Sequence, residues 1–406
     1  MALLYQLAIH SARITIPVLA LFNKKIALRQ KGIASTFHLL RDFNPETKPV
    51  FWMHCASLGE FEQGRPILEK FKSAHPNHKI VLTFFSPSGY EARKNYPYAD
   101  LVIYLPWDTV PQSQKFAKLL KADIGVFVKY EIWPNIIAAC AKSGTRLFLI
   151  SAKFRANQHF FKPWGKLFQR SLRKFEKVFV QNPESVELLE SIGISSTKVG
   201  DTRYDRVLQI AAEQYTNAVL EQWSERNFTI VAGSTWPQDE RLLKALIDAD
   251  SQVQVLVAPH EINEAHLGAL KELFGSDMIF ISDIDRLSTP RVICVDSLGV
   301  LSKLYRYGKY AYLGGGFGKG IHNTLEAVVY GIPVVFGPKF QKFQEAHELL
   351  EMGGAVSIFS GKDLLAVHQA WRQDANKLRE AGNQALDLVQ ANRGATEKIL
   401  RIIEKG

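Results

Sequence analysis

Short apolar runs alternate with helical patterns along most of the chain, and this alternation restricts the fold more than any other feature. Runs of this kind, each followed by about 10–15 residues of helical periodicity, are typical of βαβ units and buried parallel sheets. The first series of expected strands comprises residues 50–54, 79–85, 101–105, 124–128, 146–151 and 177–181. The second series comprises residues 228–232, 253–258, 278–281, 292–295, 310–313 and 333–336.

Twelve expected strands exceed one sheet of ordinary size, and a polar, helix-like stretch over residues 205–227 separates the two series. We therefore expect an α/β protein with two doubly wound, Rossmann-like domains facing a central cleft, with ligands at the carboxyl ends of the strands. The expected domains are residues 36–205 and residues 206–406, the latter including the C-terminal helices. With 406 residues, of which 47% are hydrophobic, the chain is long enough to give both domains a full core.

Residues 1–35 are expected to form an apolar, membrane-associated helix and a basic segment. The stretch from Leu3 to Phe22 is about as long as a membrane span. Three polar residues that share one helical face interrupt it, namely Gln6, His10 and Arg13, and Pro17 is expected to break it. Basic residues follow at Lys24, Lys25, Arg29 and Lys31. The pattern is typical of a helix lying in a membrane interface beside acidic lipids, and a helix packed on its own domain is the alternative.

The charge balance predicts an anionic partner. The formal net charge is +10, which suits an acidic membrane surface or a phosphorylated substrate. No nucleic-acid recognition module is visible in the sequence, so no nucleic acid is expected as a partner. The three cysteines, Cys55, Cys140 and Cys294, lie far apart without metal-ligand spacing, which favours a reducing compartment and no disulfide or zinc site.

A glycine-rich segment over residues 309–326 joins an apolar strand, five glycines within seven positions and an Asn/Thr-headed helix start. Glycine lets the backbone approach a ligand closely, and a helix start offers unpaired N–H groups to an anion. The segment therefore predicts a phosphate site, with a turn that binds no ligand as the alternative. It does not match a Walker A loop, because Leu313 and Gly320 stand where that loop needs Gly and Ser or Thr. No dinucleotide fingerprint fits it either.

Ser57 and Glu60 follow the first expected strand, at the start of a helix. Their spacing is that of a capping box, which is a purely structural role. The functional interpretation is that Glu60, at the carboxyl end of a strand and kept ionised by the helix dipole, is a general base. His54 precedes them and is expected to be a core histidine.

Polar residues also stand at other strand ends. Glu131 follows the fourth strand beside Trp133 and Pro134, and its spacing is equally consistent with a structural role and with a site. Ser234 and Thr235 end the first strand of the second series, where they suit a phosphate contact or a helix N-cap.

A paired-aspartate pattern, Asp283-Ile284-Asp285, is the one signal for a divalent metal on a nucleotide diphosphate. The same triplet type recurs at Asp248-Ala249-Asp250, so such pairs arise by chance. No metal is therefore expected.

Together these segments resemble the 3-deoxy-D-manno-octulosonate (Kdo) transferases of Gram-negative lipopolysaccharide synthesis. The resemblance extends from the basic N-terminal helix to about Phe359. Its segments, in family order, are His54-x-Ala56-Ser57-x-Gly59-Glu60, Glu131-x-Trp133-Pro134-Asn135, Gly200-x-x-Arg203-x-Asp205, Ala232-Gly233-Ser234-Thr235, and His322-Asn323-x-Leu325-Glu326 ahead of Gly331-Ile332-Pro333-Val334. One such segment alone is a weak sign, and five in order are a strong one.

The resemblance implies a glycosyltransferase of the GT-B type, with an N-terminal acceptor-binding domain and a C-terminal domain that binds a CMP-sugar donor. It implies transfer of Kdo from CMP-Kdo to the 6′-hydroxyl of a lipid A precursor (lipid IVA), with inversion and without a cofactor. The implied place is the cytoplasmic face of the inner membrane, with peripheral or N-terminal anchoring. Another GT-B sugar-nucleotide enzyme, such as a UDP-sugar transferase or epimerase, is one alternative. A non-catalytic sugar-nucleotide-binding protein is another.

The resemblance also implies roles for single residues. Glu60 would deprotonate the acceptor hydroxyl, while Glu131 and Arg203 would stabilise the transition state or the departing phosphate. The expected substrate and CMP contacts are Ser234, Thr235, Pro259, His260, Leu298, Gly299, Val300, Gly315, Gly316, His322, Asn323, Thr324, Leu325 and Glu326. Among them, Glu326 is the expected ribose partner.

Three departures from the family pattern concern the donor contacts more than the reaction class. The sequence Pro259-His260-Glu261 stands where the family usually has Pro-Arg-His. Lys129 replaces an acidic residue two positions before Glu131. Asp201 and Arg203 replace an Asn and a Lys.

Overall fold

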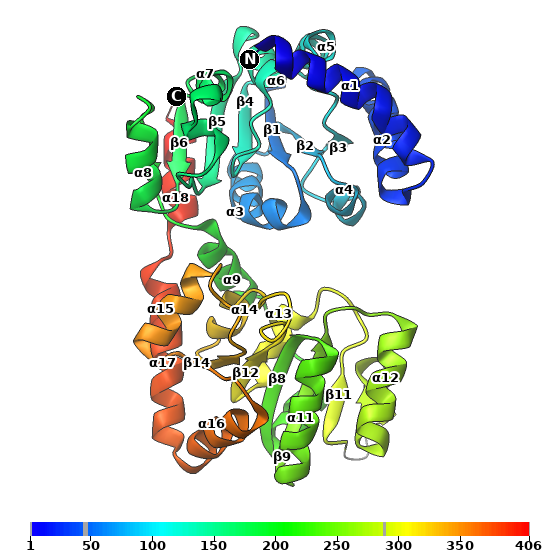
Figure 1. Ribbon diagram of the computed structural model, residues 1–406, viewed down its shortest axis with the longest axis vertical. Helices are drawn as coiled ribbons and strands as arrows, with labels where there is room; N and C mark the ends of the chain where they lie inside the picture. Colours follow the sequence, from blue (N-terminus) through cyan, green and yellow to red (C-terminus); the bar gives the residue numbers. More distant parts are fainter. Residues whose placement is uncertain (1, 44–47, 287–289, 406) are drawn as a thin grey trace. The chain divides into compact units, whose positions relative to one another are not determined.

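The computed structural model describes residues 2–43, 48–286 and 290–405, with the side chains of residues 284–286 left undescribed (Figure 1). The chain divides into a first unit, Met1–Arg206 with Arg393–Gly406, and a second unit, Val207–Asn392. Within the described ranges, each unit contains one parallel sheet of seven strands. The predicted α/β class with two doubly wound, Rossmann-like sheets is therefore confirmed.

The strands of the first unit are β1 (Val50–Cys55), β2 (Lys79–Phe84), β3 (Leu101–Tyr104), β4 (Ile124–Val128), β5 (Arg146–Ala152), β6 (Lys177–Val180) and β7 (Thr197–Lys198). Their order in the sheet is β3-β2-β1-β4-β5-β6-β7. Successive strands are thus added outward from β1 in one direction and then from β4 in the other, which makes the β1/β4 boundary the topological switch point.

Helices cover both faces of the first sheet, because alternate residues of its buried strands point to opposite sides. Trp52 and Phe127 belong to one core cluster, whereas Phe51 and Phe71 belong to the other. The helical elements between the strands are α3 (Leu58–Ala74), α4 (Pro87–Arg93), α5 (Val110–Leu120), α6 (Pro134–Lys142), η1 (His159–Phe161), η2 (Pro163–Gly165), α7 (Lys166–Leu172) and α8 (Pro183–Glu190). After the last strand comes α9 (Thr202–Ala212), which begins in the first unit and ends in the second.

The last helix, α18 (Ala395–Glu404), belongs to the first unit and lies beside its sheet (Figure 1). Ile399, Leu400 and Ile403 are buried in the same core cluster as α3. The carboxylate of Asp205 accepts hydrogen bonds from the amides of Gly394 (2.6 Å) and Thr396 (2.7 Å), which supplies acceptors at the helix start. The second domain was expected to cover residues 206–406. Its last 14 residues, Arg393–Gly406, belong to the first unit instead, so this part of the prediction is wrong.

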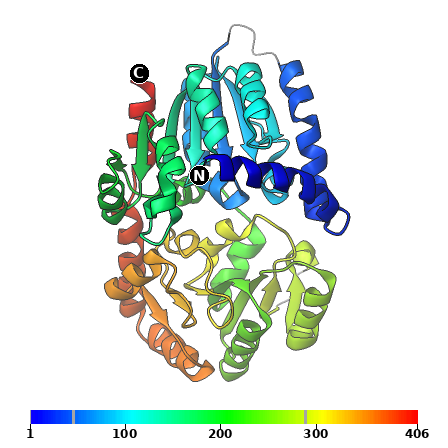
Figure 2. The same ribbon diagram turned by 45° about the horizontal axis from the view of Figure 1, so that its top comes forward.

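The N-terminal segment is folded onto the first unit as two helices, α1 (Ala2–Ala20) and α2 (Lys24–Phe43). Pro17 lies inside α1, so the predicted break at that residue is wrong. The expected boundary at residue 35 falls inside α2, which packs its buried Leu40 into the core and donates a hydrogen bond from Thr36 Oγ1 to the carbonyl of Tyr104 (2.9 Å). Figure 2 shows α1, in dark blue, crossing the first unit.

The strands of the second unit are β8 (Phe228–Thr235), β9 (Val253–Pro259), β10 (Met278–Phe280), β11 (Val292–Cys294), β12 (Tyr310–Leu313), β13 (Val334–Phe336) and β14 (Ala355–Ser357). Their order is β10-β11-β9-β8-β12-β13-β14, which puts the switch point between β8 and β12. All twelve predicted strands are present. The two that the sequence analysis did not predict, β7 and β14, are edge strands of two and three residues.

The main helices of the second unit are α10 (Ala218–Arg226), α11 (Pro237–Ala249), α12 (Glu264–Phe274), α13 (Leu301–Leu304), α14 (Leu325–Val328), α15 (Gln344–Met352), α16 (Gly361–Gln373) and α17 (Ala375–Ala391). Their core includes Leu243, Tyr310 and Trp371. Asp283, of the alternative metal pattern, lies in a 3-10 turn, Ile281–Arg286, after β10. The side chain of Asp285 lies outside the described residues.

Candidate active site

The first group of candidate residues lies at the switch point of the first sheet. β1 ends at Cys55 and leads into α3, whose first turn contains Glu60. The neighbouring strand β4 ends at Val128, three residues before Glu131. In doubly wound sheets, ligands bind beyond the carboxyl ends of the strands at this point. The fold therefore brings together two carboxyl groups from separate segments of the chain.

Glu60 is held by the backbone at the start of its own helix. Its Oε2 accepts a hydrogen bond from the amide of Ala56 (2.5 Å), and Glu60 as a whole is 8% exposed. Ser57 is the N-cap residue, but its hydroxyl makes no capping bond, so only the carboxylate half of the predicted capping box is present. Burial raises the pKa of Glu60, while the amides of Ala56 and Ser57 and the charge of Lys129 oppose that shift.

Glu131 is more strongly perturbed. Burial, and after it the negative charge of Glu60, raise the pKa of Glu131 to about 7. The two carboxyl groups are therefore electrostatically coupled and together retain a proton near neutral pH. The Lys129 charge lowers the pKa of both, and Lys129 itself has a left-handed backbone (φ 64°). Lys129, one of the departures from the family pattern, thus supplies positive charge beside the pair.

His54 is a core residue, as predicted. It is 0% exposed, and its Nδ1 lies 3.0 Å from the Thr83 hydroxyl. Burial lowers the pKa of His54 to about 3, so the ring is neutral under physiological conditions.

The segment that contains Arg203 is linked to this group by a contact between Thr202 and α3, the helix of Glu60. Its Nε donates to Asp201 (2.8 Å), and its amide donates to the same carboxylate (2.9 Å). Thr202 Oγ1 in turn donates to the carbonyl of Gln63 (2.6 Å), one turn after Glu60 on α3. Asp201 and Arg203, which both depart from the family pattern, therefore form an ion pair with each other. Comparing one sequence position at a time does not show this pairing.

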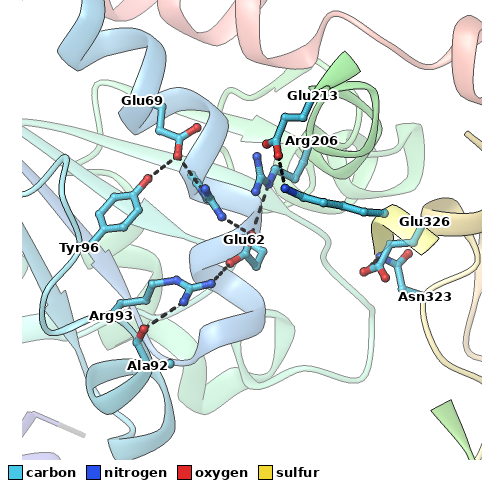
Figure 3. Close-up of polar contacts among 11 residues, drawn as sticks. Glu62, Glu69, Ala92, Arg93, Tyr96, Arg206, Glu213, Asn323 and Glu326 are labelled. Atoms are coloured by element: carbon cyan, nitrogen blue, oxygen red, sulfur yellow. Dashed lines mark hydrogen bonds and ion pairs between the residues drawn. The ribbon is translucent and has the colours of Figure 1, made fainter. Parts of the chain in front are cut away.

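Ion pairs fix α3, and with it Glu60, within the first unit (Figure 3). The carboxylate of Glu62 pairs with Arg93 of α4 (2.8 Å) and Arg206 of α9 (3.4 Å). Two turns later, Glu69 accepts a hydrogen bond from the Tyr96 hydroxyl (2.6 Å). Several charges that share partners in this way stabilise a geometry better than isolated surface pairs.

The second group of candidate residues lies at the carboxyl ends of β8, β9 and β12. Ser234 has a left-handed backbone (φ 53°), which marks a strained turn at the end of β8. Thr235 is buried, and its hydroxyl donates to Glu240 (2.9 Å), which also accepts a hydrogen bond from His266 Nε2 (2.9 Å). The N-cap of α11 is Trp236. The alternative prediction, that Ser234 or Thr235 caps this helix, is therefore wrong for both residues.

The glycine segment is mostly a packing device. A Cβ on Gly314 would lie 2.3 Å from the Ser234 carbonyl oxygen, and one on Gly316 would lie 2.5 Å from the Gly337 amide. The amide of Gly315 donates to Asp239 (2.9 Å). Further amides are engaged within the same unit, those of Gly314, Gly318, Gly320 and Ile321. The glycines therefore allow backbone segments to meet, and the predicted phosphate cradle does not consist of these amides.

Unengaged polar groups follow the glycines instead. Within the described ranges, the amides of His322, Asn323 and Thr324 donate to no acceptor, and the buried Thr324 hydroxyl has no partner. The Asn323 side chain donates to Glu326 Oε1 (2.9 Å), as Figure 3 shows, and accepts from the Leu325 amide (3.2 Å). The helix expected directly after the glycines begins only at Leu325 and has a single turn. An anion would therefore meet residues 322–324.

A ring stack that the sequence analysis did not anticipate adjoins these groups. His260, which follows Pro259 at the end of β9, stacks between Trp236 (centroids 4.7 Å apart) and His322 (4.4 Å). The Nζ of Lys319 lies 4.9 Å from the Trp236 ring. A depression of about 310 Å³ beside the stack is lined by residues that include Trp236, Phe317 and Lys319. The one sign of this stack in the sequence is that Trp236 directly follows Ser234 and Thr235.

The remaining predicted contacts lie around the same edge. Leu298, Gly299 and Val300 connect β11 to α13, and Leu298 is 83% exposed. The next residue, Leu301, approaches Gly233 of β8, where an added Cβ would lie 3.1 Å from its side chain. Leu325 is fully buried, so only its backbone is available to a ligand.

The two doubly wound, parallel-sheet units place the protein in the GT-B fold class. A putative UDP-N-acetylglucosamine 2-epimerase from Listeria monocytogenes has a similar fold, with a TM-score of 0.61 at 12% sequence identity over 88% of this chain and 96% of that one. The fold alone does not separate members of this class, because one fold hosts many reactions.

The sequence comparisons make that separation. The family model of the 3-deoxy-D-manno-octulosonic-acid transferases (kdotransferases) matches residues 31–206. The transferase of this name from Aquifex aeolicus is 30% identical over 332 residues, which cover 79% of this chain and 86% of that protein. The one from Rickettsia prowazekii is 27% identical over 378 residues, covering 88% and 80%. The chain belongs to the 3-deoxy-D-manno-octulosonic acid transferase family and is a Kdo-transferring glycosyltransferase of the GT-B type.

Proposed function

We propose that this enzyme transfers Kdo from CMP-Kdo to the 6′-hydroxyl of a lipid A precursor, lipid IVA, with inversion of the anomeric carbon. Family membership supports the transfer of Kdo. The observation that carries the mechanism is the coupled pair Glu60 and Glu131 at the switch point of the first sheet. Two carboxyl groups with raised pKa values, Glu60 buried and Glu131 half-buried, are the arrangement that acid–base catalysis near neutral pH needs.

In the proposed step, Glu60 takes the proton of the acceptor hydroxyl. The acceptor oxygen forms a bond to the anomeric carbon while the bond from that carbon to the phosphate oxygen breaks, and CMP leaves with the electron pair. Attack from the face opposite the leaving group gives inversion. The backbone donors at Ala56 and Ser57 favour the ionised form of Glu60, as a base requires. General-base catalysis of this kind contributes about 10²–10⁴-fold.

Glu131 and Arg203 are assigned to the charge that develops on the donor. With a pKa of about 7, Glu131 is partly protonated at neutral pH and is able to donate a hydrogen bond to an anionic oxygen. Arg203 is always cationic and adds positive charge. Its ion pair with Asp201 orients the guanidinium rather than leaving it mobile.

The second unit is assigned to the CMP part of the donor. The unengaged amides of residues 322–324, the hydroxyl of Ser234 and the ring stack are suited to a phosphate and a nucleoside, and Glu326 is assigned to the ribose. A nucleoside monophosphate leaves with a single phosphate, which preorganised protein donors are able to stabilise. The proposal therefore includes no metal or other cofactor.

The acceptor is a lipid, and α1 is the element proposed to meet its membrane. In the described part of the chain, α1 is the one helix long and apolar enough to cross a membrane, and none of its residues is buried. Tyr5 donates to Asp108 (2.6 Å) and Gln6 donates to Asn135 (2.8 Å), so the first turns of α1 are tied to the first unit. Apolar side chains are exposed on its outer side, at Leu3, Leu4, Leu7, Ile14, Val18 and Leu19.

We infer that α1 lies in the interface of the inner membrane at its cytoplasmic face. A helix tied by side chains to a globular unit suits this position better than one that spans the bilayer alone. The basic start of α2 and the net charge of +10 favour acidic headgroups.

The substrates are tested by incubating the full chain with CMP-Kdo and tetraacylated lipid A precursor and identifying the product by mass spectrometry and NMR. The expected product carries Kdo on the 6′-oxygen, with the anomeric configuration opposite to that in the donor. CMP is expected to inhibit the transfer, and UDP to inhibit it at least about tenfold less, because the second unit is proposed to bind the cytidine nucleotide specifically. An unmodified lipid, or inhibition by UDP equal to that by CMP, would contradict the proposal and favour another GT-B enzyme.

A further inference from the structure

Three rings from three separate segments form one stack at the carboxyl edge of the second sheet. Trp236 and His260 have centroids 4.7 Å apart and planes 26° apart, and His260 and His322 are 4.4 Å and 25° apart. Trp236 follows β8, His260 follows β9, and His322 lies in the glycine segment, just after its last glycine, Gly320. Two imidazoles at this distance disfavour simultaneous protonation, because like charges repel.

Neither imidazole has a hydrogen-bond partner anywhere in the described part of the chain. The carboxylates of the adjacent helix α11 are engaged elsewhere. Asp239 accepts from Tyr312 (2.8 Å) and from the Gly315 and Trp236 amides (each 2.9 Å), and Glu240 accepts from Thr235 and His266.

Other charged groups near the stack come from three segments. Lys319, on the glycine segment, lies over the Trp236 ring. Arg241, on α11, lines the adjoining depression, and Glu261 follows His260 as an exposed residue. The two cations favour an anion at this edge, whereas Glu261, and Glu326 beside Asn323, oppose it. The ring nitrogens are thus left without an internal counter-ion beside three unengaged amides.

We propose that His260 and His322 form a proton-dependent clamp for the phosphate of the leaving CMP, so that the phosphate dianion of CMP, bound beside the amides of residues 322–324, draws one proton onto the imidazole pair. The inference rests on the proposed function, in which a CMP-linked donor binds to the second unit. It adds a regulatory property to that site, namely that the affinity for CMP depends on pH through two named residues.

The sign of the effect follows from the surroundings of His322. Burial and the neighbouring His260 lower the pKa of His322, so the free enzyme keeps this ring neutral at physiological pH. A bound dianion favours the charged form of His322 and raises the pKa of that ring. Binding therefore takes up a proton, and affinity falls as pH rises, by at most about tenfold per pH unit for one proton.

The test is isothermal titration of the full chain with CMP, in pairs of buffers that differ in ionisation enthalpy. The second phosphate pKa is about 6, so at pH 7.5 and above CMP is already a dianion and any proton taken up is bound by the protein. Uptake of about 0.7–1 proton is expected at pH 7.5, with a dissociation constant that rises about three- to tenfold between pH 7.5 and 8.5.

Two variants make the test specific. His260→Arg places a permanent charge at an exposed position, so CMP binding is expected to persist with uptake reduced at least about threefold and a flat pH dependence. His347→Gln removes a histidine of α15 outside the site and is expected to keep the wild-type uptake. Wild-type binding of CMP without proton uptake, or equal uptake by wild type and His260→Arg, would overturn the clamp and leave the proposed function intact. If CMP does not bind at all, the donor assignment falls, and the clamp falls with it.

Discussion

The two switch points share a topology but differ in chemistry. At the β1/β4 boundary the side chains are carboxyl groups, Glu60 and Glu131, whose pKa values burial raises. At the β8/β12 boundary the nearby carboxylates, Asp239 and Glu240, accept hydrogen bonds within the unit, and the groups left over are amides and stacked rings. The backbone spacing at the second boundary is set by glycines such as Gly314.

This difference shows how one sheet topology serves two purposes. Carboxyl groups held at raised pKa are reactive, because they exchange protons near neutral pH. Engaged carboxylates and neutral donors are inert but suit the recognition of an anion. We therefore assign chemistry to the first unit and nucleotide binding to the second, and the following variants test that division.

The largest expected effect in these variants concerns backbone packing in the second unit. In Gly314→Ala, the new Cβ would lie 2.3 Å from the Ser234 carbonyl oxygen and 2.6 Å from Thr235 Cα, so the backbone must move. We expect a loss of about 1–3 kcal/mol in the free energy of unfolding, a melting temperature lower by about 3–10 °C, and weaker CMP binding.

Gly318→Ala is the matched control, because its Cβ would meet only the Gly315 carbonyl oxygen, at 3.7 Å. Thermal unfolding followed by circular dichroism compares the two, and we expect Gly318→Ala to melt with the wild type. If both variants melt together, the glycine segment is not a packing device and its amides return as candidates for the phosphate site.

The second effect concerns the surface of the first unit. Ile14 on α1 is 74% exposed, and Ile14→Glu replaces an apolar contact with a charge. Burial of such a side chain contributes about 1.5–3 kcal/mol, so binding to vesicles with acidic lipids is expected to weaken about tenfold or more in a sedimentation assay. Thr15→Glu adds the same charge at the next exposed, polar position and is expected to weaken binding less. Equal losses would mean that charge alone, rather than an apolar face, governs the membrane contact.

The smallest effect is a change in the pH dependence of stability. The pKa of Glu131 is raised from its ordinary value of 4.5 to about 7 in the folded protein. Between these values the native state binds more protons than the unfolded state, so this group's stabilising contribution is complete below pH 4.5 and is lost as pH rises through about 7.

Glu131→Gln removes this dependence. We therefore expect the difference in melting temperature, variant minus wild type, to increase by roughly a few degrees between pH 5 and pH 8. Scanning calorimetry at several pH values measures the gain. Parallel curves would show that Glu131 titrates normally and would weaken the contrast between the two switch points.

Much of the fold was predictable because buried parallel strands are short, continuous apolar runs. All twelve of the predicted strands are present. β7 has only two residues, neither of them buried, and β14 has one buried residue, so neither forms a continuous apolar run. The assignment of α18 to the first unit was not predictable, because its apolar spacing fits any sheet face. The structure adds the Asp205 carboxylate that caps its start.

The candidate site was predictable where one strand end carries the signal, as for Glu60 and Glu131. The ring stack was not, because Trp236, His260 and His322 come from three segments and meet only when the sheet forms. The glycine segment was read correctly as a place of close approach. What approaches Gly314 and Gly316 is backbone, which sequence spacing cannot distinguish from a ligand.

The central claim is that Glu60 performs the chemistry while the second unit holds the nucleotide, and Glu60→Gln tests it most directly. The measurement pairs the rate of Kdo transfer to tetraacylated lipid A precursor with the dissociation constant for CMP, both on the full chain. Glu91→Gln, which removes a partly exposed carboxylate of α4, is the control. The account predicts that Glu60→Gln lowers the rate by about 10²–10⁴-fold and leaves the CMP dissociation constant within about twofold of wild type. An unchanged rate, or a loss of CMP binding in proportion to the rate, would contradict it.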